Sequence, residues 1–540
     1  MGDSIRSNWE MAAYTDYQGD TYYYKDVAEK IARFHLLFER HGIARGAKIA
    51  LIGKNSRNWG AAYMATLLYG AVVVPILPDF LPEDVDHIVE HSGSEVLFAS
   101  DEWIKQLDDK TFNRVRALFT LHDFTLVRSI EPTLADDLAR ITELQAEAYP
   151  TGLTPASFRL PEVSNDEIAT INYTSGTAGH SKGVVLSYRS FMANLQYAQD
   201  NMPLEAGNSI VSFLPLAHAY GCAFDFIFPT SLGCHITFLS KIPSPQVILK
   251  AFQDIRPELV MFVPLVLEKI YKNKLLPVIG KPVMKVLLAT PGIRKLLHRK
   301  ICKTLNDSFG GRFREIVIGG AALNPEVERF LKRIGFRFAI GYGMTECGPL
   351  VSYAGWNTHR NGSSGQAVDT LEMKIDSEDP YHEVGEIMVR GANVMLEYYK
   401  NPEATSKALT EDGWLRTGDL GVFDRDHFIY IKGRSKSLIL GPSGQNIYPE
   451  EIESKLNNLP YIIESVVVER NHKLVALVYP DYEHVNTGQM SLDMLREHME
   501  KLREQVNTRL PKYMQVSQIE LVNAEFEKTP KKSIKRYKYR

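Results

Sequence analysis

The sequence predicts an α/β protein with a large N-terminal domain and a smaller C-terminal domain of the α+β type. In the first hundred residues, apolar runs of strand length alternate with segments of helical periodicity. This alternation indicates parallel sheets covered by helices on both faces. Between residues 365 and 430 the pattern changes to short strands separated by regular turn signals, which is typical of a small β-subdomain. A chain of 540 residues is too long to fold around one compact core, so its length predicts two to four domains.

The N-terminal elements follow in a regular order. Residues 105–162 are charged and irregular, and we expect them to be peripheral. Ser187 is a suitable N-cap for a helix that begins near Tyr188. Strands are expected at 22–24, 48–52, 71–76, 95–100, 168–173, 209–213, 235–238, 259–263 and 314–318, and helices at 27–41, 59–69 and 81–90.

A second change of pattern follows Gly433-Arg434-Ser435-Lys436. Strands are expected at 462–469 and 473–479, with a charged helix at 492–510. We therefore place a domain boundary near Ser435. The predicted domains are 1–434, with subdomains of about 1–190, 191–364 and 365–434, and 435–540.

Composition excludes some classes of protein. The 62 basic and 65 acidic residues give a net charge of -3, so the chain has no overall attraction for nucleic acid. Four widely spaced cysteines argue against a zinc site or a disulfide scaffold and fit a reducing cytoplasm. No secretory pattern is found at the N-terminus, and the most apolar window, 61–77, contains Gly70 and Pro75, which predicts a buried helix and strand.

One segment, residues 272–303, is rich in lysine and arginine with interleaved apolar residues. The simpler interpretation is a solvated pair of helices. The alternative is contact with an anionic membrane surface, at the inner face of a membrane, or with a phosphate of coenzyme A. We expect a cytoplasmic protein, and this alternative adds a peripheral membrane association.

A loop between two apolar runs, 168–173 and 183–186, has the residue types of a phosphate-binding site. Its glycines, serines and threonines allow backbone N–H groups and hydroxyls to surround an anion, and Lys182 adds a positive charge. The spacing excludes a Walker P-loop, because Lys182 follows Ser181 and precedes Gly183. Taken alone, such a loop could be an ordinary turn.

The loop resembles the phosphate-binding signature of the AMP-forming acyl-activating enzymes, the superfamily of acyl-CoA synthetases, luciferases and peptide-synthetase adenylation domains. Members usually have proline where this chain has Ser181, which we interpret as a tolerated loop change. Five further stretches match in the expected order, so the resemblance covers nearly the whole chain. The loop residues that it implies for nucleotide binding are Thr174, Ser175, Gly176, Thr177, Gly179 and Lys182.

Two of these stretches concern the acyl group. Residues 213–221, FLPLAHAYG, are similar to the segment beside the acyl pocket, and the resemblance implies a role for His218. On its own, His218 is more typical of a partly buried structural histidine. Residues 263–269, VPLVLEK, are similar to a stretch common in long-chain fatty acyl members and favour a lipid substrate.

Two more stretches concern adenine and the α-phosphate. Gly320 and Ala321 follow an expected strand and are small enough for a planar base to lie on the backbone. In residues 341–346, GYGMTE, the resemblance implies that Tyr342 stacks on adenine beside Gly343. It further implies that Thr345 binds the α-phosphate and that Glu346 binds Mg²⁺, a cation that prefers carboxylate and phosphate oxygens.

The last matching stretches concern the ribose and the movement of the C-terminal domain. The resemblance implies that Asp419 accepts hydrogen bonds from the ribose hydroxyls and that Arg434 also points to the ribose and phosphate. Lys436 falls at the hinge position of a small domain that rotates between two half-reactions. Gly444 falls in the loop that this rotation brings to the pantetheine tunnel.

The C-terminal tail departs from the family pattern. Members end in a motif whose last lysine bridges the carboxylate and the α-phosphate, and a gapless alignment places Ser533 at that position. A serine supplies no positive charge for the phosphate transition state. Our hypothesis is that Lys532 takes this role, with Lys531 or Lys535 as alternates. The remaining interpretation is a solvated basic tail.

Together, the resemblance implies ATP-dependent activation of a fatty acid of the long-chain type, with ATP, Mg²⁺ and coenzyme A, and the sequence does not fix the length of the acyl chain. No Ser-His-Asp or Cys-His signature is needed, because the acyl adenylate replaces a protein-bound intermediate. One alternative is another carboxylate, such as an aromatic acid, or a carrier-protein thiol as acceptor. Another is a weakened nucleotide- or acyl-binding protein, suggested by Ser533. The sequence does not indicate the oligomeric state.

Overall fold

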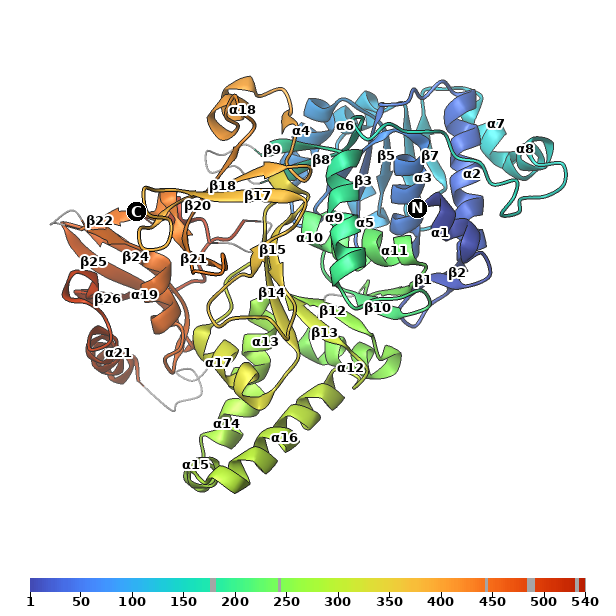
Figure 1. Cartoon of the computed structure of the whole chain (residues 1–540). Coiled ribbons are helices and arrows are strands. Elements are labelled where there is room, and N and C mark those ends of the chain that lie inside the picture. The colour runs from blue at the N-terminus through green and yellow to red at the C-terminus, as the bar shows by residue number, and fades with distance from the viewer. Residues whose placement is uncertain (175–180, 241–243, 442–444, 483–490, 530–533, 540) are drawn as a thin grey trace.

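The structure is a computed structural model that describes residues 1–540 except 175–180, 241–243, 442–444, 483–490, 530–533 and 540, and except the side chains of residues 109, 273 and 274. The N-terminal and middle parts of the chain form the larger body in Figure 1, and the C-terminal part lies at its side. Parallel α/β sheets, an antiparallel β-subdomain and an α+β C-terminal part are all present. The predicted fold class is confirmed.

The largest sheet has eight strands in the order β19-β9-β8-β4-β3-β5-β6-β7. Its central strands, from β8 to β6, are parallel, whereas β9, β19 and β7 pair antiparallel at the two edges. The strands are β3 (Lys48–Ile52), β4 (Val72–Ile76), β5 (Ser94–Ala99), β6 (Ala117–Thr120), β7 (Leu126–Ser129), β8 (Ile168–Thr174), β9 (Lys182–Ser187) and β19 (Glu397–Tyr398). Residues 105–162 therefore contribute two strands to this sheet, although we expected them to be peripheral.

Helices of this region begin and end where their caps predict. Ser56 accepts a hydrogen bond from the N–H of Trp59 at the start of α3, and Gly70, with a φ of 85°, ends that helix. Ser187 caps α9 as predicted, through the N–H of Ser190. The helices are α1 (Gly2–Ser7), α2 (Tyr24–Arg40), α3 (Arg57–Tyr69), α4 (Pro82–Ser92), α5 (Asp101–Ile104), α6 (Asp109–Arg114), α7 (Leu134–Ala139), α8 (Ile141–Ala148) and α9 (Tyr188–Asn201).

A four-stranded sheet joins the N-terminus to residues more than two hundred positions later. Its order is β10-β11-β1-β2, with β1 parallel to β11. The strands are β1 (Ala12–Asp16), β2 (Thr21–Tyr23), β10 (Ser209–Ser212) and β11 (His235–Phe238), and the helices that follow β10 are α10 (Ala219–Gly221), the π-helix η1 (Cys222–Ile227) and α11 (Phe228–Leu232).

A five-stranded sheet lies at the centre of the molecule in Figure 1. Strands β12, β13 and β14 are parallel, and β15 and β16 turn back antiparallel. The strands are β12 (Leu259–Phe262), β13 (Glu315–Ile318), β14 (Phe338–Gly343), β15 (Leu350–Ala354) and β16 (Gln366–Ala367), and the helices are α12 (Pro245–Ile255), α13 (Pro264–Ile270) and α17 (Pro325–Ile334).

Between β12 and β13 the chain leaves the body as a helical hairpin. It consists of the π-helix η2 (Tyr271–Leu275), α14 (Leu276–Ile279), α15 (Pro282–Ala289) and α16 (Pro291–Ser308). In Figure 1 the end of this hairpin, at α15, is the part farthest from the sheets. Among the described residues, we find no helix whose length and apolar character would allow it to cross a bilayer.

The β-subdomain is an antiparallel sheet in the order β17-β18-β20-β21. Its elements are β17 (Leu371–Asp376), β18 (Gly385–Gly391), α18 (Pro402–Ala408), β20 (Leu415–Phe423) and β21 (Ile429–Arg434). The C-terminal part contains the short strands β22 (Ile439–Leu440) and β23 (Asn446–Ile447), the sheet β24 (Ile462–Arg470), β25 (Lys473–Pro480) and β26 (Gln518–Leu521), and helices α19 (Pro449–Leu456) and α21 (Leu492–Asn507).

Buried apolar residues of the described chain form one large cluster that runs from Ile5 to Ile429 and, in the C-terminal part, two smaller clusters, from Ile447 to Val516 and from Val466 to Phe526. The predicted boundary near Ser435 falls between the large cluster and the two smaller ones. The domain and subdomain limits remain predictions.

Candidate active site

The predicted phosphate loop connects two antiparallel strands. Thr174, at the end of β8, lies opposite Lys182, at the start of β9, and the Thr174 hydroxyl lies 3.5 Å from the Lys182 carbonyl oxygen. The buried apolar residues of both strands fix these two ends. Four other predicted loop residues lie outside the described residues: Ser175, Gly176, Thr177 and Gly179.

Tyr398 joins the end of this loop to the predicted magnesium ligand. Its hydroxyl donates a hydrogen bond to Oε1 of Glu346 at 2.8 Å, and Nζ of Lys182 lies 5.0 Å from the centroid of its ring. Burial and the Glu346 carboxylate raise the pKa of Tyr398, so the hydroxyl keeps its proton. Lys182 and Glu346 are therefore held on two sides of one tyrosine.

The position of Tyr398 comes from strand pairing. Tyr398 pairs with Val184 in the β19–β9 ladder, and the N–H of Met395 donates to the carbonyl of Glu346 at 2.8 Å. Sequence reasoning missed Tyr398, because it is 52 positions from Glu346 and no local motif marks it.

A second cluster contains three of the predicted nucleotide-binding residues. Tyr342, in β14, donates a hydrogen bond to Oδ2 of Asp419, in β20, at 2.7 Å. Nε of Arg434, at the end of β21, lies 3.0 Å from Oδ1 of the same carboxylate. Asp419 is 4% exposed, and burial raises its pKa despite the nearby guanidinium. Asp419 is thus a buried acceptor beside an exposed cation.

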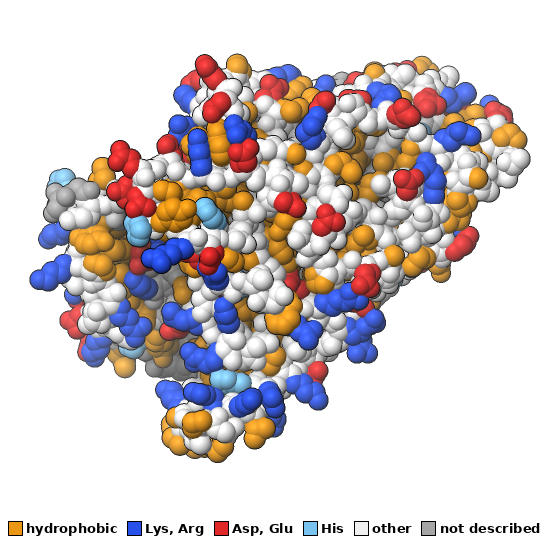
Figure 2. All heavy atoms as spheres, in the orientation of Figure 1, with side chains coloured by type: hydrophobic (Ala, Val, Ile, Leu, Met, Phe, Trp, Pro, Cys, Tyr) orange, Lys and Arg blue, Asp and Glu red, His pale blue; other side chains and the backbone are white. Residues whose placement is uncertain are grey.

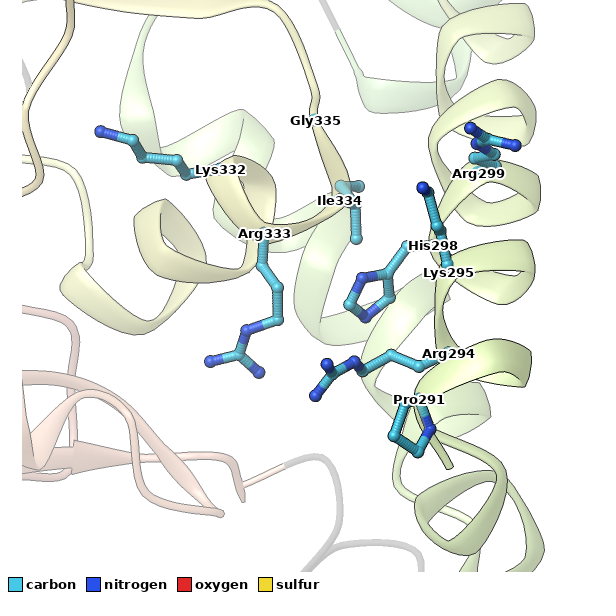
Figure 3. Close-up of a pocket in the computed structure, with 9 residues that line it drawn as sticks. All are labelled: Pro291, Arg294, Lys295, His298, Arg299, Lys332, Arg333, Ile334 and Gly335. Atoms are coloured by element: carbon cyan, nitrogen blue, oxygen red, sulfur yellow. The ribbon is translucent and has the colours of Figure 1, made fainter. Parts of the chain in front are cut away.

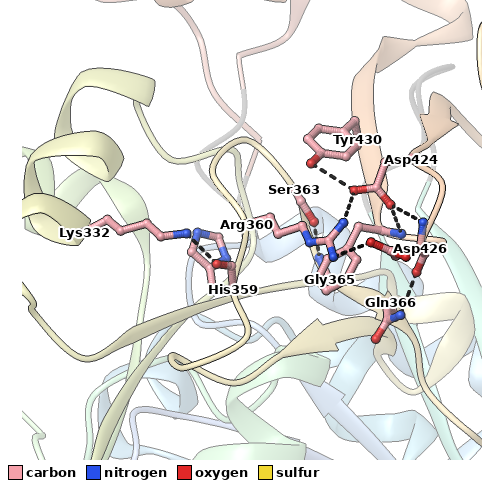
Figure 4. A network of polar contacts seen from close by, with 10 residues as sticks. Lys332, His359, Arg360, Ser363, Gly365, Gln366, Asp424, Asp426 and Tyr430 are labelled. Carbon is pink, nitrogen blue, oxygen red and sulfur yellow. Dashed lines mark hydrogen bonds and ion pairs between the residues drawn. The ribbon is translucent and has the colours of Figure 1, made fainter.

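A polar network, shown in Figure 4, links the strands that carry these residues. Arg360, in the loop after β15, forms ion pairs of 2.6 Å with Asp424 and with Asp426, in the turn between β20 and β21. Lys332 of α17 donates to the carbonyl of His359 at 2.6 Å. The turn is therefore tied to the central sheet, which holds Asp419 beside Tyr342.

Backbone geometry explains the small residues of the two adenine motifs. A Cβ on Gly343 would lie 2.3 Å from the carbonyl oxygen of Pro349, so no larger residue fits there. A Cβ on Gly319 would lie 3.1 Å from the ring of Tyr220. Gly320, with a φ of 84°, and Ala321 are exposed, which leaves a backbone surface open to a planar ligand.

The predicted acyl-pocket segment packs against this strand end. Tyr220 donates a hydrogen bond to the carbonyl of Val317 at 3.0 Å. His218 accepts a hydrogen bond from the Tyr220 N–H at 3.2 Å and so caps the short helix α10. The structure thus links His218, through Tyr220, to the strand end at Gly319.

Thr345 is buried in the 3₁₀ turn Thr345–Cys347, next to Glu346.

The C-terminal tail is attached to α19. Arg536 forms a close ion pair with Glu453, and its Nε lies 3.8 Å from Glu450. Glu450 in turn lies beside Gly433 of β21, next to Arg434. The predicted residues Gly444 and Lys532, and the alternate Lys531 with Ser533, lie outside the described residues. The alternate Lys535 is described, and its N–H donates to the carbonyl of Glu527 at 2.8 Å.

Glu346 fits a cation that takes most of its ligands from phosphate. The described residues contain no group of three or more His, Cys, Asp and Glu side chains suited to a metal ion. Mg²⁺ is commonly held by one or two carboxylates together with substrate phosphates. The carboxylate of Glu346, which Tyr398 links to Lys182, is compatible with this mode of binding.

Comparison with protein families gives two matches. A model described as AMP-binding enzyme matches residues 4–399, and a model of the AMP-binding enzyme C-terminal domain matches residues 451–532. Curated relatives include the long-chain-fatty-acid–CoA ligase FadD15 of Mycobacterium bovis, 29% identical over 452 residues, with coverage of 79% of this chain and 72% of the relative. The peroxisomal long chain acyl-CoA synthetase 6 of Arabidopsis thaliana is 28% identical over 465 residues, with coverage of 82% and 66%.

Solved structures show the same fold. ATP-bound MatB from Rhodopseudomonas palustris has a TM-score of 0.78 at 21% identity and covers 100% of this chain and 98% of its own. The o-succinylbenzoate coenzyme A synthetase MenE from Bacillus subtilis, in complex with ATP and magnesium, has a TM-score of 0.77 at 20% identity, with coverage of 99% and 98%. At these identities the likeness concerns the fold alone.

Proposed function

Because this chain belongs to the family of AMP-binding enzymes, we propose that it is an ATP-dependent acid–thiol ligase that activates a long-chain fatty acid. The acid is first joined to AMP with release of pyrophosphate, and the acyl group then passes to coenzyme A. The observation that carries the proposal is the Tyr342–Asp419–Arg434 cluster, because Tyr342 lies at the end of β14, four positions before Glu346, the partner of Tyr398.

In this proposal each cluster holds one part of ATP. Tyr342 and the exposed backbone at Gly320 and Ala321 take the adenine, and Asp419 accepts hydrogen bonds from the ribose hydroxyls. Arg434 lies beside the ribose and phosphate. Thr174, Lys182, Thr345 and the loop residues bind the phosphates. Mg²⁺, held by Glu346, would neutralise phosphate charge.

The first step would form a mixed anhydride. A carboxylate oxygen of the acid attacks the α-phosphorus, and the bond between the α-phosphorus and the α,β-bridging oxygen breaks, so that pyrophosphate leaves with the electron pair. Lys182 stabilises the charge on the departing group. We propose that Lys532 stabilises the negative charge that develops on the α-phosphate, because Ser533 occupies the position where members of the family have a lysine.

The second step would transfer the acyl group to a thiol. The sulfur of coenzyme A attacks the acyl carbon, the thiol proton is lost to solvent, and AMP leaves. We propose that residues 435–540 form a mobile domain that turns about Lys436 and brings Gly444 to the thiol. His218, beside Tyr220, would lie close to the acyl group in this step.

The choice of a fatty acid has two supports. Several relatives are named as long-chain fatty acid–CoA ligases, and residues 263–269 are similar to a stretch of such proteins. At less than 30% identity another carboxylate, such as an aromatic acid, is the alternative substrate, and a carrier-protein thiol is the alternative acceptor. We propose a cytoplasmic location.

Exchange of labelled pyrophosphate into ATP tests the first step. We expect exchange that depends on added acid and is fastest with long-chain acids. We expect it to fall at least a hundredfold in Lys532→Ala and to persist in Lys535→Ala. Exchange that survives Lys532→Ala but fails in Lys531→Ala would move the role to that lysine. Binding of ATP without exchange for any acid would contradict the ligase and favour a nucleotide-binding protein.

A further inference from the structure

The hairpin α14–α16 exposes apolar side chains that nothing in the described chain covers. Neither α14 nor α15 contains a buried residue, although their sequences are LPVI and PVMKVLLA. Val283 is 72% exposed, Val286 68% and Leu296 66%. Six of the large apolar residues that are exposed in the described chain lie within 21 positions: Leu276, Val278, Val283, Val286, Ile293 and Leu296. Isolated exposed apolar residues are normal, but such a concentration indicates an interaction surface.

The same hairpin has an unbalanced positive charge. Residues 270–306 contain nine lysines and arginines and no aspartate or glutamate, in a chain whose net charge is -3. Within the described part of the chain, the cations of α15 and α16 form no ion pairs, whereas Arg496, Lys501 and Arg503 of the charged helix α21 each pair with an acidic residue of that helix. In a solvated surface helix we expect the cations to pair with acidic residues of the same helix, as they do in α21.

Apolar and basic groups are separated along the hairpin. In Figure 2, apolar side chains gather at its outer end and lysines and arginines lie between this end and the body of the molecule. With a rise of about 1.5 Å per residue, the N-terminal half of α16 spans on the order of 13 Å, which is longer than the depth of about 5 to 8 Å of the headgroup region of one leaflet. The first basic residues of α16, Arg294 and Lys295, could therefore lie at the lipid phosphates while the apolar end of the hairpin lies at the acyl boundary.

A surface pocket lies in the basic band, between α16 and the end of α17. Its volume is about 390 Å³, and its lining is free of acidic residues. Arg294 and His298 of α16 and Arg333 of α17 point toward one another across it, as Figure 3 shows. Burial, together with the nearby cations Arg333 and Arg294, lowers the pKa of His298, which favours neutral imidazole there. Cations that converge without an acidic partner favour a bound anion.

We propose that this hairpin docks on an anionic phospholipid bilayer, with the apolar side chains of α15 inserted at the acyl boundary and the cations of α16 and α17 at the lipid phosphates. Amphipathic elements with a basic face bind membranes in this way. This proposal of membrane binding does not depend on the proposed ligase reaction. A membrane surface also offers a source of lipid substrate if that reaction holds.

Co-flotation with vesicles tests the proposal without ATP or acid. We expect the full chain to bind vesicles of phosphatidylcholine with 30% phosphatidylglycerol and to bind pure phosphatidylcholine far more weakly, with affinity that falls between about 0.1 M and 0.5 M salt. The double variant Val283→Asp/Val286→Asp should bind at least tenfold less. The triple variant Arg294→Gln/Lys295→Gln/Arg299→Gln should lose about a hundredfold, since each cation near the surface contributes about fivefold.

The control variants lie on α21, which also has exposed apolar residues. Leu492→Asp/Met494→Asp and Lys501→Gln match the changes in type, and we expect them to bind like the unchanged protein. The unfolding midpoint should be the same in all variants, because none of these side chains is buried. Equal binding of vesicles by hairpin and control variants would overturn the proposal. A dimer that dissociates in Val283→Asp/Val286→Asp, with no vesicle binding, would replace it with contact between two copies.

Discussion

The hydroxyl of Tyr342 donates to the carboxylate of Asp419 at 2.7 Å, although the two residues are 77 positions apart in the chain. Tyr342 ends a strand of the central sheet and Asp419 belongs to the β-subdomain. The bond therefore joins two sheets at the point where the proposed nucleotide binds. In the same place Arg434 contacts the second oxygen of Asp419 and brings in the end of β21.

This arrangement predicts different effects for two substitutions. Asp419→Ala should raise the KM for ATP about tenfold to a hundredfold, because it removes charge-assisted hydrogen bonds to the ribose. Tyr342→Phe keeps the ring that would stack on adenine, so this variant should raise the KM for ATP only about twofold to tenfold. Initial rates at varied ATP concentration measure both. A larger effect of Tyr342→Phe than of Asp419→Ala would contradict the assignment of the ribose to Asp419.

Glu346 is expected to affect the chemical step. Glu346→Gln should lower the rate of pyrophosphate exchange by about a hundredfold or more and weaken its dependence on magnesium concentration, because the amide is a poorer ligand for a hard cation. Tyr398→Phe removes one hydrogen bond to Glu346 and should have a smaller effect. The exposed Glu397, next to Tyr398, provides the matched control Glu397→Gln. Unchanged magnesium dependence in Glu346→Gln would rule out its role as the metal ligand.

Gly343→Ala tests the packing of the second motif. A methyl group there would meet the carbonyl of Pro349 at 2.3 Å, and the backbone has to shift to accept it. We expect a loss of about 1 to 3 kcal/mol in the free energy of unfolding. Chemical denaturation measures this loss. The control is Gly292→Ala, at an exposed position where a Cβ would meet nothing within 4 Å.

The tail attachment predicts a pH dependence. Burial raises the pKa of Glu453 to about 7, although Arg536 lowers it. A carboxyl whose pKa is higher in the folded than in the unfolded protein binds more protons when folded, so its contribution to stability is present below about pH 4.5 and is lost as the pH rises to about 7.

Glu453→Gln should therefore flatten the dependence of unfolding free energy on pH between 5 and 7. The exposed Glu451, on the same helix, gives the control Glu451→Gln. Denaturation of the full chain at several pH values measures the difference between the two variants. Parallel curves for Glu453→Gln and the unchanged protein would show that Glu453 does not titrate in this range.

The sequence by itself determined the fold class and the elements that carry the site. The strand at 48–52, the buried window 61–77 and the cap at Ser187 were all predicted, because apolar periodicity and local hydrogen bonding depend on neighbouring residues. The motifs that contain Tyr342, Glu346 and Asp419 were also visible as short local patterns.

Only the tertiary structure decided which distant residues meet. The contact of Tyr398 with Glu346 depends on β19 adding to the edge of β9, and the pairing of β1 with β11 depends on the packing of sheets far apart in sequence. Neither is encoded in a local pattern, because strand pairing is set by the burial of whole faces. The charge of residues 272–303 already indicated solvated helices or a membrane-facing surface, but only the fold shows which apolar side chains of α15 are exposed.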